Sequence, residues 1–135
     1  GQAIVLKGVS YPMVGVLPLV CDLSKRPQGH GYTILKVERP NPYFEVGTEL
    51  RGHEFHYSRI LRWEGSDTDL ALNIQRGVGF ANRRDGISYK NVLALYTHIH
   101  ALGTPQWAPA LVAAARAWRQ KTGPAKLSSF AGPVG

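Results

Sequence analysis

The stretch TELRGHEFHYSRILRW, residues 48–63, is the longest strand-like region of this 135-residue chain. Apolar and polar side chains alternate along it with the two-residue period that is typical of a half-buried strand. The alternation fails near Ser58, which predicts a bend at that point. The apolar members of the pattern are Leu50, Phe55, Tyr57, Ile60 and Leu61.

The composition on either side of this region predicts further strands. They are expected at residues 3–6, 13–22, 32–37 and 71–75, and Pro18 interrupts the second of them. Pro and Gly in residues 25–31 predict a loop, and Asp85-Gly86 predicts a hairpin turn. Residues 91–97 form a nearly continuous apolar run, as expected for a central strand that is buried on both faces.

One helix is predicted near the end of the chain. Thr104 is expected to be its N-cap and Pro105 its first residue, and Gly123-Pro124 ends it. The apolar residues between these ends recur at helical spacing, at Trp107, Leu111, Ala114, Ala115 and Trp118. The patterns therefore predict a strand-rich domain with one C-terminal helix. Residues 125–135 show no periodicity and are expected to be a loose tail.

Composition and charge exclude several classes of protein. The chain has 16 Lys and Arg against 9 Asp and Glu, but these cations are scattered, so we expect a solvated basic surface and no nucleic-acid site. No apolar run approaches the roughly 18 to 20 residues that span a bilayer. We therefore expect no membrane partner. The single cysteine cannot form an internal disulfide, which fits a reducing cytoplasm. The chain begins with Gly1, and we expect it to be a piece of something longer.

Four of the five histidines lie in two short groups, His53 with His56 and His98 with His100. Residues two apart on a strand share a face, so His98 and His100 are expected to point the same way, as are Glu54 and His56. One hypothesis makes the four histidines ligands of a metal in a small β-rich protein. The other makes His98, at the end of an apolar strand, a general base. The spacing lacks the His-Glu-x-x-His signature, so the favoured prediction has no metal.

Cys21 does not have the surroundings of a nucleophile. A catalytic cysteine needs a tight, often glycine-flanked turn that exposes its sulfur. Cys21 lies instead in the strand-like sequence LVCDL, residues 19–23, and is expected to be a buried, inert thiol. The chain thus offers a base and no convincing nucleophile.

Four segments, in order, resemble the C-terminal glutaminase part of the cobyrinic acid a,c-diamide synthases. They are YPMVGVLP at 11–18, KRPQGHGY at 25–32, LRGHEFHYS at 50–58 and YTHIH at 96–100. The resemblance extends over about residues 3 to 121. It implies an α/β to α+β fold, namely the C-terminal portion of a class I glutamine amidotransferase-like (flavodoxin-like) domain with a strand-rich mixed sheet. Residues 1–124 would be this portion, and the turn that carries the nucleophilic cysteine would lie upstream.

The resemblance also implies a chemistry. Such domains hydrolyse glutamine on a cysteine thiolate, and the ammonia passes to an ATP-binding domain that activates a tetrapyrrole carboxylate. The family's catalytic histidine matches His98, as general base and acid. Either Glu54 or His56 is expected to orient it.

Further expectations concern substrates and partners. His53, Tyr57 and His100 are expected to bind substrate. This piece is expected to bind no cofactor, with ATP and Mg²⁺ held by a separate N-terminal domain. Ala101 stands where family members commonly have Phe, so the related siroheme amidation is a candidate substrate variant. A homodimer is expected to form through an exposed sheet edge.

Overall fold

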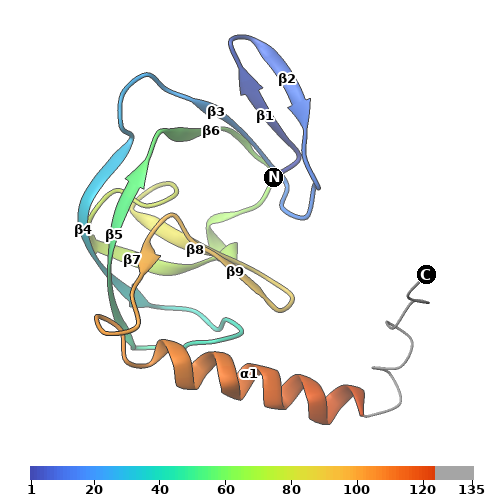
Figure 1. Ribbon diagram of the computed structural model, residues 1–135, viewed down its shortest axis with the longest axis vertical. Helices are drawn as coiled ribbons and strands as arrows, with labels where there is room; N and C mark the ends of the chain where they lie inside the picture. The colour runs from blue at the N-terminus through green and yellow to red at the C-terminus, as the bar shows by residue number, and fades with distance from the viewer. Residues whose placement is uncertain (124–135) are drawn as a thin grey trace, which may run out of the picture.

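Ten strands of the described chain form two β-sheets, and one long helix follows them (Figure 1). The computed structural model describes residues 1–123. The four-stranded sheet has the order β2-β1-β3-β6, with β1 at Ala3–Leu6, β2 at Val9–Pro12, β3 at Leu19–Leu23 and β6 at Ser58–Trp63. The six-stranded sheet has the order β10-β5-β4-β7-β8-β9, with β4 at Gly29–Val37, β5 at Glu49–His56, β7 at Leu70–Arg76, β8 at Arg84–Tyr89, β9 at Val92–Ala94 and β10 at His98–Ile99. A 3-10 turn, η1 (Asp67–Asp69), precedes β7, and the helix α1 spans Trp107–Thr122.

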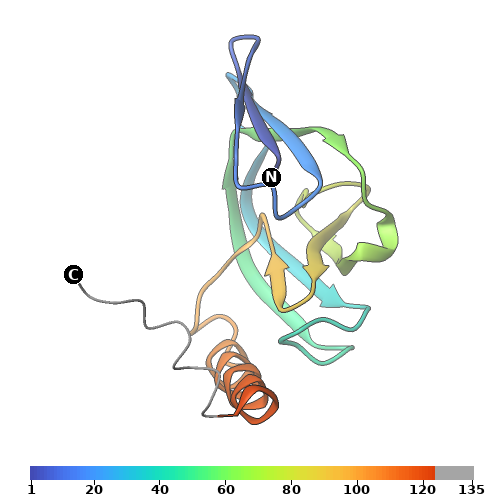
Figure 2. The ribbon, with the colours of Figure 1, turned by 90° about the vertical axis from the view of Figure 1, so that its right-hand side faces the viewer.

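The strand pairing is mixed. β1 and β3 run parallel, and the other paired strands within residues 1–123 are antiparallel. The predicted strand-rich, mixed fold with one C-terminal helix is therefore confirmed. The β1–β2 hairpin and α1 lie at opposite ends of the molecule in both views (Figures 1 and 2).

Residues 48–63 link the two sheets. β5 lies in one sheet and β6 in the other, with Tyr57 between them, which confirms the predicted bend. The segment between β3 and β4 turns the same corner, because β3 pairs with β6 and β4 with β5. At the corner the Ser24 amide donates to the Tyr57 carbonyl (2.9 Å) and the Gln28 amide to the His56 carbonyl (2.8 Å).

Two clusters of buried side chains form the core. The larger lies on β4, β5 and β7 with Phe44, and comprises Leu35, Val37, Phe44, Leu50, Ala71, Leu72 and Ile74. The smaller comprises Leu19, Leu70 and Ile87, with Cys21, Ile60 and Trp63 packed against it. Within residues 107–122, no helix residue is buried, so the core is built by the sheets.

The predicted loop at residues 25–31 is partly wrong, because Gly29 to Gly31 already belong to β4. Glycine serves here to make room for side chains and does not end the strand. A Cβ on Gly29 would collide with His56 Nε2 and would lie 2.7 Å from Glu54 Oε2.

Two strand predictions are also corrected. Residues 13–18 are not part of a strand, and β3 begins after Pro18. Of residues 91–97, only Val92–Ala94 form a strand, and β9 is an edge strand that pairs with β8 alone. The remaining apolar residues cross from that edge of the sheet to the opposite edge, where β10 begins.

The hairpin turn lies three residues before the predicted place. Asn82 and Arg83 both have positive φ (50° and 56°) between the bridged residues Ala81 and Arg84. Positive φ at both central residues is typical of a two-residue hairpin loop. Asp85 is instead a buried residue of β8.

Thr104 is not the N-cap of the helix. The N-cap is Gln106, and the helix begins at Trp107. The Thr104 hydroxyl is buried against β5, where it donates to the Arg51 carbonyl (3.0 Å) and accepts from the Arg51 amide (3.2 Å). The predicted end of the helix is confirmed, since Gly123 is the C-cap with φ +63°.

The edge and membrane predictions can be compared with the described residues. β2 is an edge strand whose four residues are all exposed, as the predicted open sheet edge requires. Within residues 1–123, no helix is both long and apolar enough to cross a membrane. The predicted tail at 125–135 lies outside the described residues.

We predict that Thr104→Val destabilises the chain by about 1–3 kcal/mol, because it leaves the Arg51 amide and carbonyl without their buried partner. Urea unfolding measures this loss. Thr122→Val is the matched control, since the Thr122 hydroxyl makes only an exposed bond to the Trp118 carbonyl, and it should stay within about 0.5 kcal/mol. An equal loss of unfolding free energy in the two variants would contradict a stabilising hydrogen bond between Thr104 and β5.

Candidate functional site

His98 lies on the two-residue strand β10, at the edge of the six-stranded sheet. It pairs with His53 of β5, and the two imidazole rings stack with centroids 5.1 Å apart and planes 28° apart. Both side chains are exposed. The pairing therefore presents two adjacent imidazoles to solvent on one face of the sheet, which we call the outer face.

Aromatic residues surround this pair on the outer face. Tyr32 is directly opposite His53 on β4, and His30 is directly opposite Phe55, with their rings in edge contact at 5.7 Å. Tyr32 is 75% exposed and Phe55 is 54% exposed. The outer face around His98 is thus open and rich in aromatic rings.

Glu54 lies on the opposite, inner face of β5. It is buried, and its carboxylate accepts from the Gly79 amide (2.7 Å) and the Val78 amide (3.1 Å). These bonds hold the turn after β7. The carboxylate does not face the His98 imidazole, so the expectation that Glu54 orients His98 is corrected.

His56 shares the inner face with Glu54, as predicted. Its Nδ1 lies 3.0 Å from the Ser58 carbonyl, which can only accept, so Nδ1 carries the proton. Its Nε2 is buried and finds no hydrogen-bond partner among residues 1–123. The ring stacks on Tyr96 with centroids 3.9 Å apart. His56 therefore contacts the residue two before His98, and not His98 itself.

Asp85 holds the backbone immediately before His98. Its Oδ1 accepts from the Tyr96 amide (3.1 Å) and the Gly86 amide (2.8 Å), and its Oδ2 accepts from the Thr97 amide (3.0 Å). The side chain is 1% exposed. Burial raises the pKa of Asp85 above its ordinary value, and the three backbone donors offset part of that rise.

Gly52 allows the close approach of β10. A Cβ at this position would collide with the His98 carbonyl oxygen and would lie 2.7 Å from Thr97 Cγ2. The glycine of the GHEFHYS segment is therefore required sterically, next to the candidate base.

The decisive comparison with known proteins is with a family model. Residues 1–106 match the CobB/CobQ-like glutamine amidotransferase domain. The chain belongs to this family.

Three similar relatives carry the name cobyrinate a,c-diamide synthase. The protein of Methanosphaera stadtmanae is 42% identical over 98 residues, which are 73% of this chain and 22% of the relative. That of Magnetococcus marinus is 37% identical over 120 residues, or 89% and 25%. That of Methanothermobacter thermautotrophicus is 42% identical over 96 residues, or 71% and 21%. The chain thus spans a quarter or less of the length of these relatives.

The remaining predicted site residues, Tyr57 and His100, do not form one cluster with the His53–His98 pair. Tyr57, at the corner between β5 and β6, is in edge contact with Phe55 at 5.7 Å. His100 follows β10, and its Nδ1 accepts from the Leu102 amide (3.2 Å). Substrate binding by His53, Tyr57 and His100 stays a prediction.

The histidines do not converge on one point. His53 and His98 lie on the outer face of the sheet, while His56 lies on the inner face. No group of three or more His, Cys, Asp or Glu within residues 1–123 is placed to hold a metal ion. The four-histidine metal hypothesis therefore has no ligand set in this part of the chain.

Cys21 packs against the smaller core cluster of the amidotransferase domain and is half-buried, where a fully buried thiol was expected. Its Sγ lies 3.9 Å from the Ala3 carbonyl, and the thiol lines a small apolar cavity with Leu19 and Ile60. This is the environment expected of a structural thiol. Nothing in these surroundings exposes the sulfur as a nucleophile would require.

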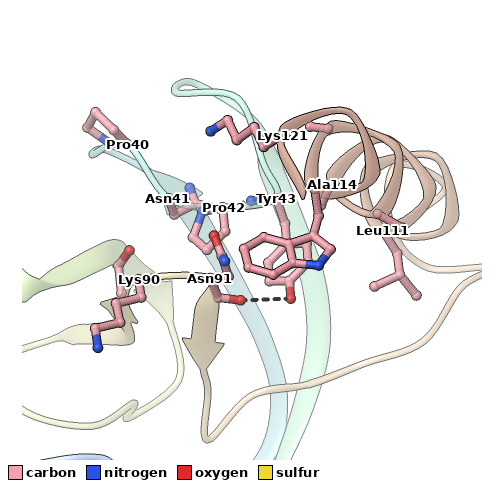
Figure 3. A pocket seen from close by; sticks show the side chains of 13 residues that line it. Pro40, Asn41, Pro42, Tyr43, Lys90, Asn91, Leu111, Ala114 and Lys121 are labelled. Carbon is pink, nitrogen blue, oxygen red and sulfur yellow. Dashed lines mark hydrogen bonds between the residues drawn. The ribbon is translucent and has the colours of Figure 1, made fainter. Parts of the chain in front are cut away.

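A groove of about 710 Å³ lies between α1 and residues 40–43 (Figure 3). At its floor the Tyr43 hydroxyl donates to the Asn91 carbonyl (3.1 Å). The groove is lined by residues of α1, of the segment 40–43 and of the segment 88–91, and none of the candidate site residues contributes to it. It plays no part in the site around His98.

Asp85 is the residue that sequence reasoning missed. The Asp-Gly pair is a strong hairpin signal, so Asp85 was assigned to a turn and its carboxylate was not considered as a buried hydrogen-bond acceptor. A buried strand that contains an aspartate was the available signal, because a buried carboxylate must find donors.

We predict an acid-dependent stability contribution from Asp85 in the amidotransferase domain. Because its folded pKa is raised, the folded chain keeps the proton where the unfolded chain has lost it. The contribution of this carboxyl is full below the unfolded pKa of about 3.9 and declines as the pH rises to the folded pKa. The destabilisation caused by Asp85→Asn should be largest at low pH and shrink toward neutrality, as measured by urea unfolding across the pH range.

Asp22 provides the control for the sign. Its hydrogen bond to Arg59 lowers its pKa, so its contribution is present above the unfolded pKa and lost as the pH falls through the folded value. The loss caused by Asp22→Asn should therefore grow with pH. If the destabilisation changed with pH in the same direction in both variants, the raised pKa of Asp85 would be refuted.

We also predict that Gly52→Ala displaces β10 and costs about 1–3 kcal/mol of stability through overpacking. NMR contacts between the His53 and His98 rings should weaken. Gly103→Ala is the matched control, since a Cβ there would meet its nearest atoms at 3.6 Å. Ring contacts that persist unchanged in Gly52→Ala would show that the close approach is not required.

Proposed function

We propose that this chain supplies the general base of a glutamine-hydrolysing amidotransferase, and that His98 is this base. The observation that carries the proposal is the exposed His98 imidazole, fixed on the outer face of the sheet beside His53 in a domain of the CobB/CobQ-like family. An exposed imidazole on an ordered strand can exchange protons with a group brought to it.

The chemistry requires a thiol as well as the base. The amide carbon of glutamine is a poor electrophile, so a thiolate must attack it. His98 takes the thiol proton, the S–C bond forms, and the imidazolium returns the proton to the departing nitrogen as the C–N bond breaks. Ammonia leaves and a thioester remains. Water, deprotonated by the same imidazole, then releases glutamate and restores the thiol.

The thiol approaches from the outer face in this proposal. Cys21 lies in the other sheet and packs in the core, so it does not serve. The imidazole pair and the surrounding rings are exposed on the outer face, which leaves space for a cysteine from outside residues 1–123.

The proposal extends to the larger enzyme through its relatives. They are named cobyrinate a,c-diamide synthases, and this chain spans a quarter or less of their length. We propose that the ammonia amidates a tetrapyrrole carboxylate, activated by ATP and Mg²⁺ in a separate domain, in the cytoplasm. The siroheme variant rests on Ala101, and a homodimer would form along the exposed β2 edge.

We predict that His98→Ala lowers glutamine hydrolysis by about 10²- to 10⁴-fold in the protein that contains this chain together with its nucleophilic cysteine. Amidation with added ammonia should persist, because free ammonia bypasses the glutaminase site. Thr122→Val, on α1 and away from the outer face, is the control and should retain hydrolysis. Hydrolysis within threefold of wild type in His98→Ala would refute the role of this residue.

A further inference from the structure

The position of His98 depends on a chain crossing. β9 and β10 lie at opposite edges of the six-stranded sheet, yet only three residues, 95–97, separate them. Tyr96 and Thr97 belong to no strand, so sheet pairing does not fix them. β10 itself has two residues, which is too short to define its own register. The location of the imidazole therefore depends on what holds residues 96 and 97.

The Asp85 carboxylate is the group that holds them. Both of its oxygens accept from this crossing, Oδ1 from the Tyr96 amide and Oδ2 from the Thr97 amide. Asp85 comes from β8, four strands away from β10 in the sheet. Its side chain is 1% exposed, and no Lys, Arg or His within residues 1–123 forms an ion pair with it.

An unpaired buried carboxylate is costly, and a neutral core residue would be the simpler choice if Asp85 only filled space. Its three backbone donors offset that cost and make the interaction directional. Asparagine has nearly the same shape but only one acceptor oxygen. In Asp85→Asn, one of the two crossing amides must face an NH₂ group and loses its bond.

The remaining contacts to the crossing come from the same side. The Tyr96 ring stacks on His56, and its hydroxyl accepts from the Ser58 hydroxyl (3.0 Å). Thr97 packs over Gly52. All of these groups lie behind the strand, while the His98 ring lies on the outer face against His53. Asp85 can thus act on the imidazole only through the backbone.

We propose that Asp85 is a positioning residue, which fixes residues 96 and 97 so that the His98 imidazole is held where it can exchange a proton with the attacking thiol. The inference rests on the proposed function of His98. Displacements of about 1 Å at a reacting group can cost about 10²-fold in rate.

The test uses the protein that contains this chain and its nucleophilic cysteine. In Asp85→Asn, kcat for glutamine hydrolysis should fall at least about tenfold, with the KM for glutamine within threefold, because substrate contacts are unchanged. The pH profile of cysteine alkylation by iodoacetamide should shift toward that of an unpaired thiol, since the imidazole no longer faces the sulfur. A merely structural role would not move that profile.

Asp22→Asn is the matched control. It also removes a carboxylate on a strand, paired with Arg59 at 2.8 Å, but makes no contact with the crossing. It should leave kcat and the alkylation profile unchanged. If Asp85→Asn does not fold, Asp85→Glu carries the same test: it keeps the charge but shifts the crossing by one methylene, and should lower kcat several-fold. Wild-type kcat and profile in the folded variant overturn the inference.

Hydrogen exchange on the unmodified protein provides an independent measurement. The Tyr96 and Thr97 amides should exchange as slowly as those of the central strands, although neither lies in a strand. Exchange at the rate of an open loop would overturn the inference. Loss of hydrolysis in His98→Ala, combined with normal Asp85 variants, would refute the positioning role alone, whereas normal His98→Ala would refute the proposed function.

Discussion

The two-residue period of strand β5 is the constraint on which the site depends. Successive side chains of a strand point to opposite faces, so the segment His53 to His56 is divided between the two sides of the sheet. His53 and Phe55 are exposed on the outer face, while Glu54 and His56 lie on the inner face. One short sequence thereby provides both the exposed rings of the outer face and the side chains that hold the inner face. A register slip of one residue would exchange the two sets.

The inner face is held together by carboxylates bound to backbone amides. Glu54 ties down the turn after β7, and Asp85 ties down the crossing before β10. Both side chains are buried, with 2% and 1% of their surface exposed. Backbone amides donate to a carboxylate in only a few geometries, so such bonds define loop positions more narrowly than apolar packing does. The turn after β7 and the crossing before His98 are both of this kind, since neither lies in a strand.

Much of the fold could be predicted from sequence because its signals are local. The alternation along residues 48–63, the failure of that pattern near Ser58 and the end of the helix at Gly123 each reflect a local backbone preference. The errors arise where a tertiary contact overrides that preference. Gly29 continues a strand because the His56 ring occupies the space that a side chain at position 29 would need. Thr104 hydrogen-bonds to β5, although threonine is a residue type that favours the N-cap position. Asp85-Gly86 lies within a strand because the carboxylate has partners eleven and twelve residues away. For the site, sequence reasoning grouped Glu54 with His56 correctly but could not tell that His98 lies opposite His53, whose side chain is on the other face of β5.

This division of the sheet suits a residue whose reaction partner comes from outside residues 1–123. A proton acceptor must be held within a few tenths of an ångström of its working position, yet its reacting edge must stay uncovered until the partner arrives. At the His98 strand, the backbone is fixed from the inner face by Asp85 and by the close approach over Gly52, while His53 is the one aromatic group within residues 1–123 that the ring stacks on. Under the proposed function, holding the backbone from behind would fix the imidazole in advance and remove the entropy cost of ordering it when the thiol arrives. Position and access of the imidazole can therefore be changed by different substitutions. Substitutions on the inner face would alter where the His98 imidazole lies, and substitutions on the outer face would alter which groups can reach it.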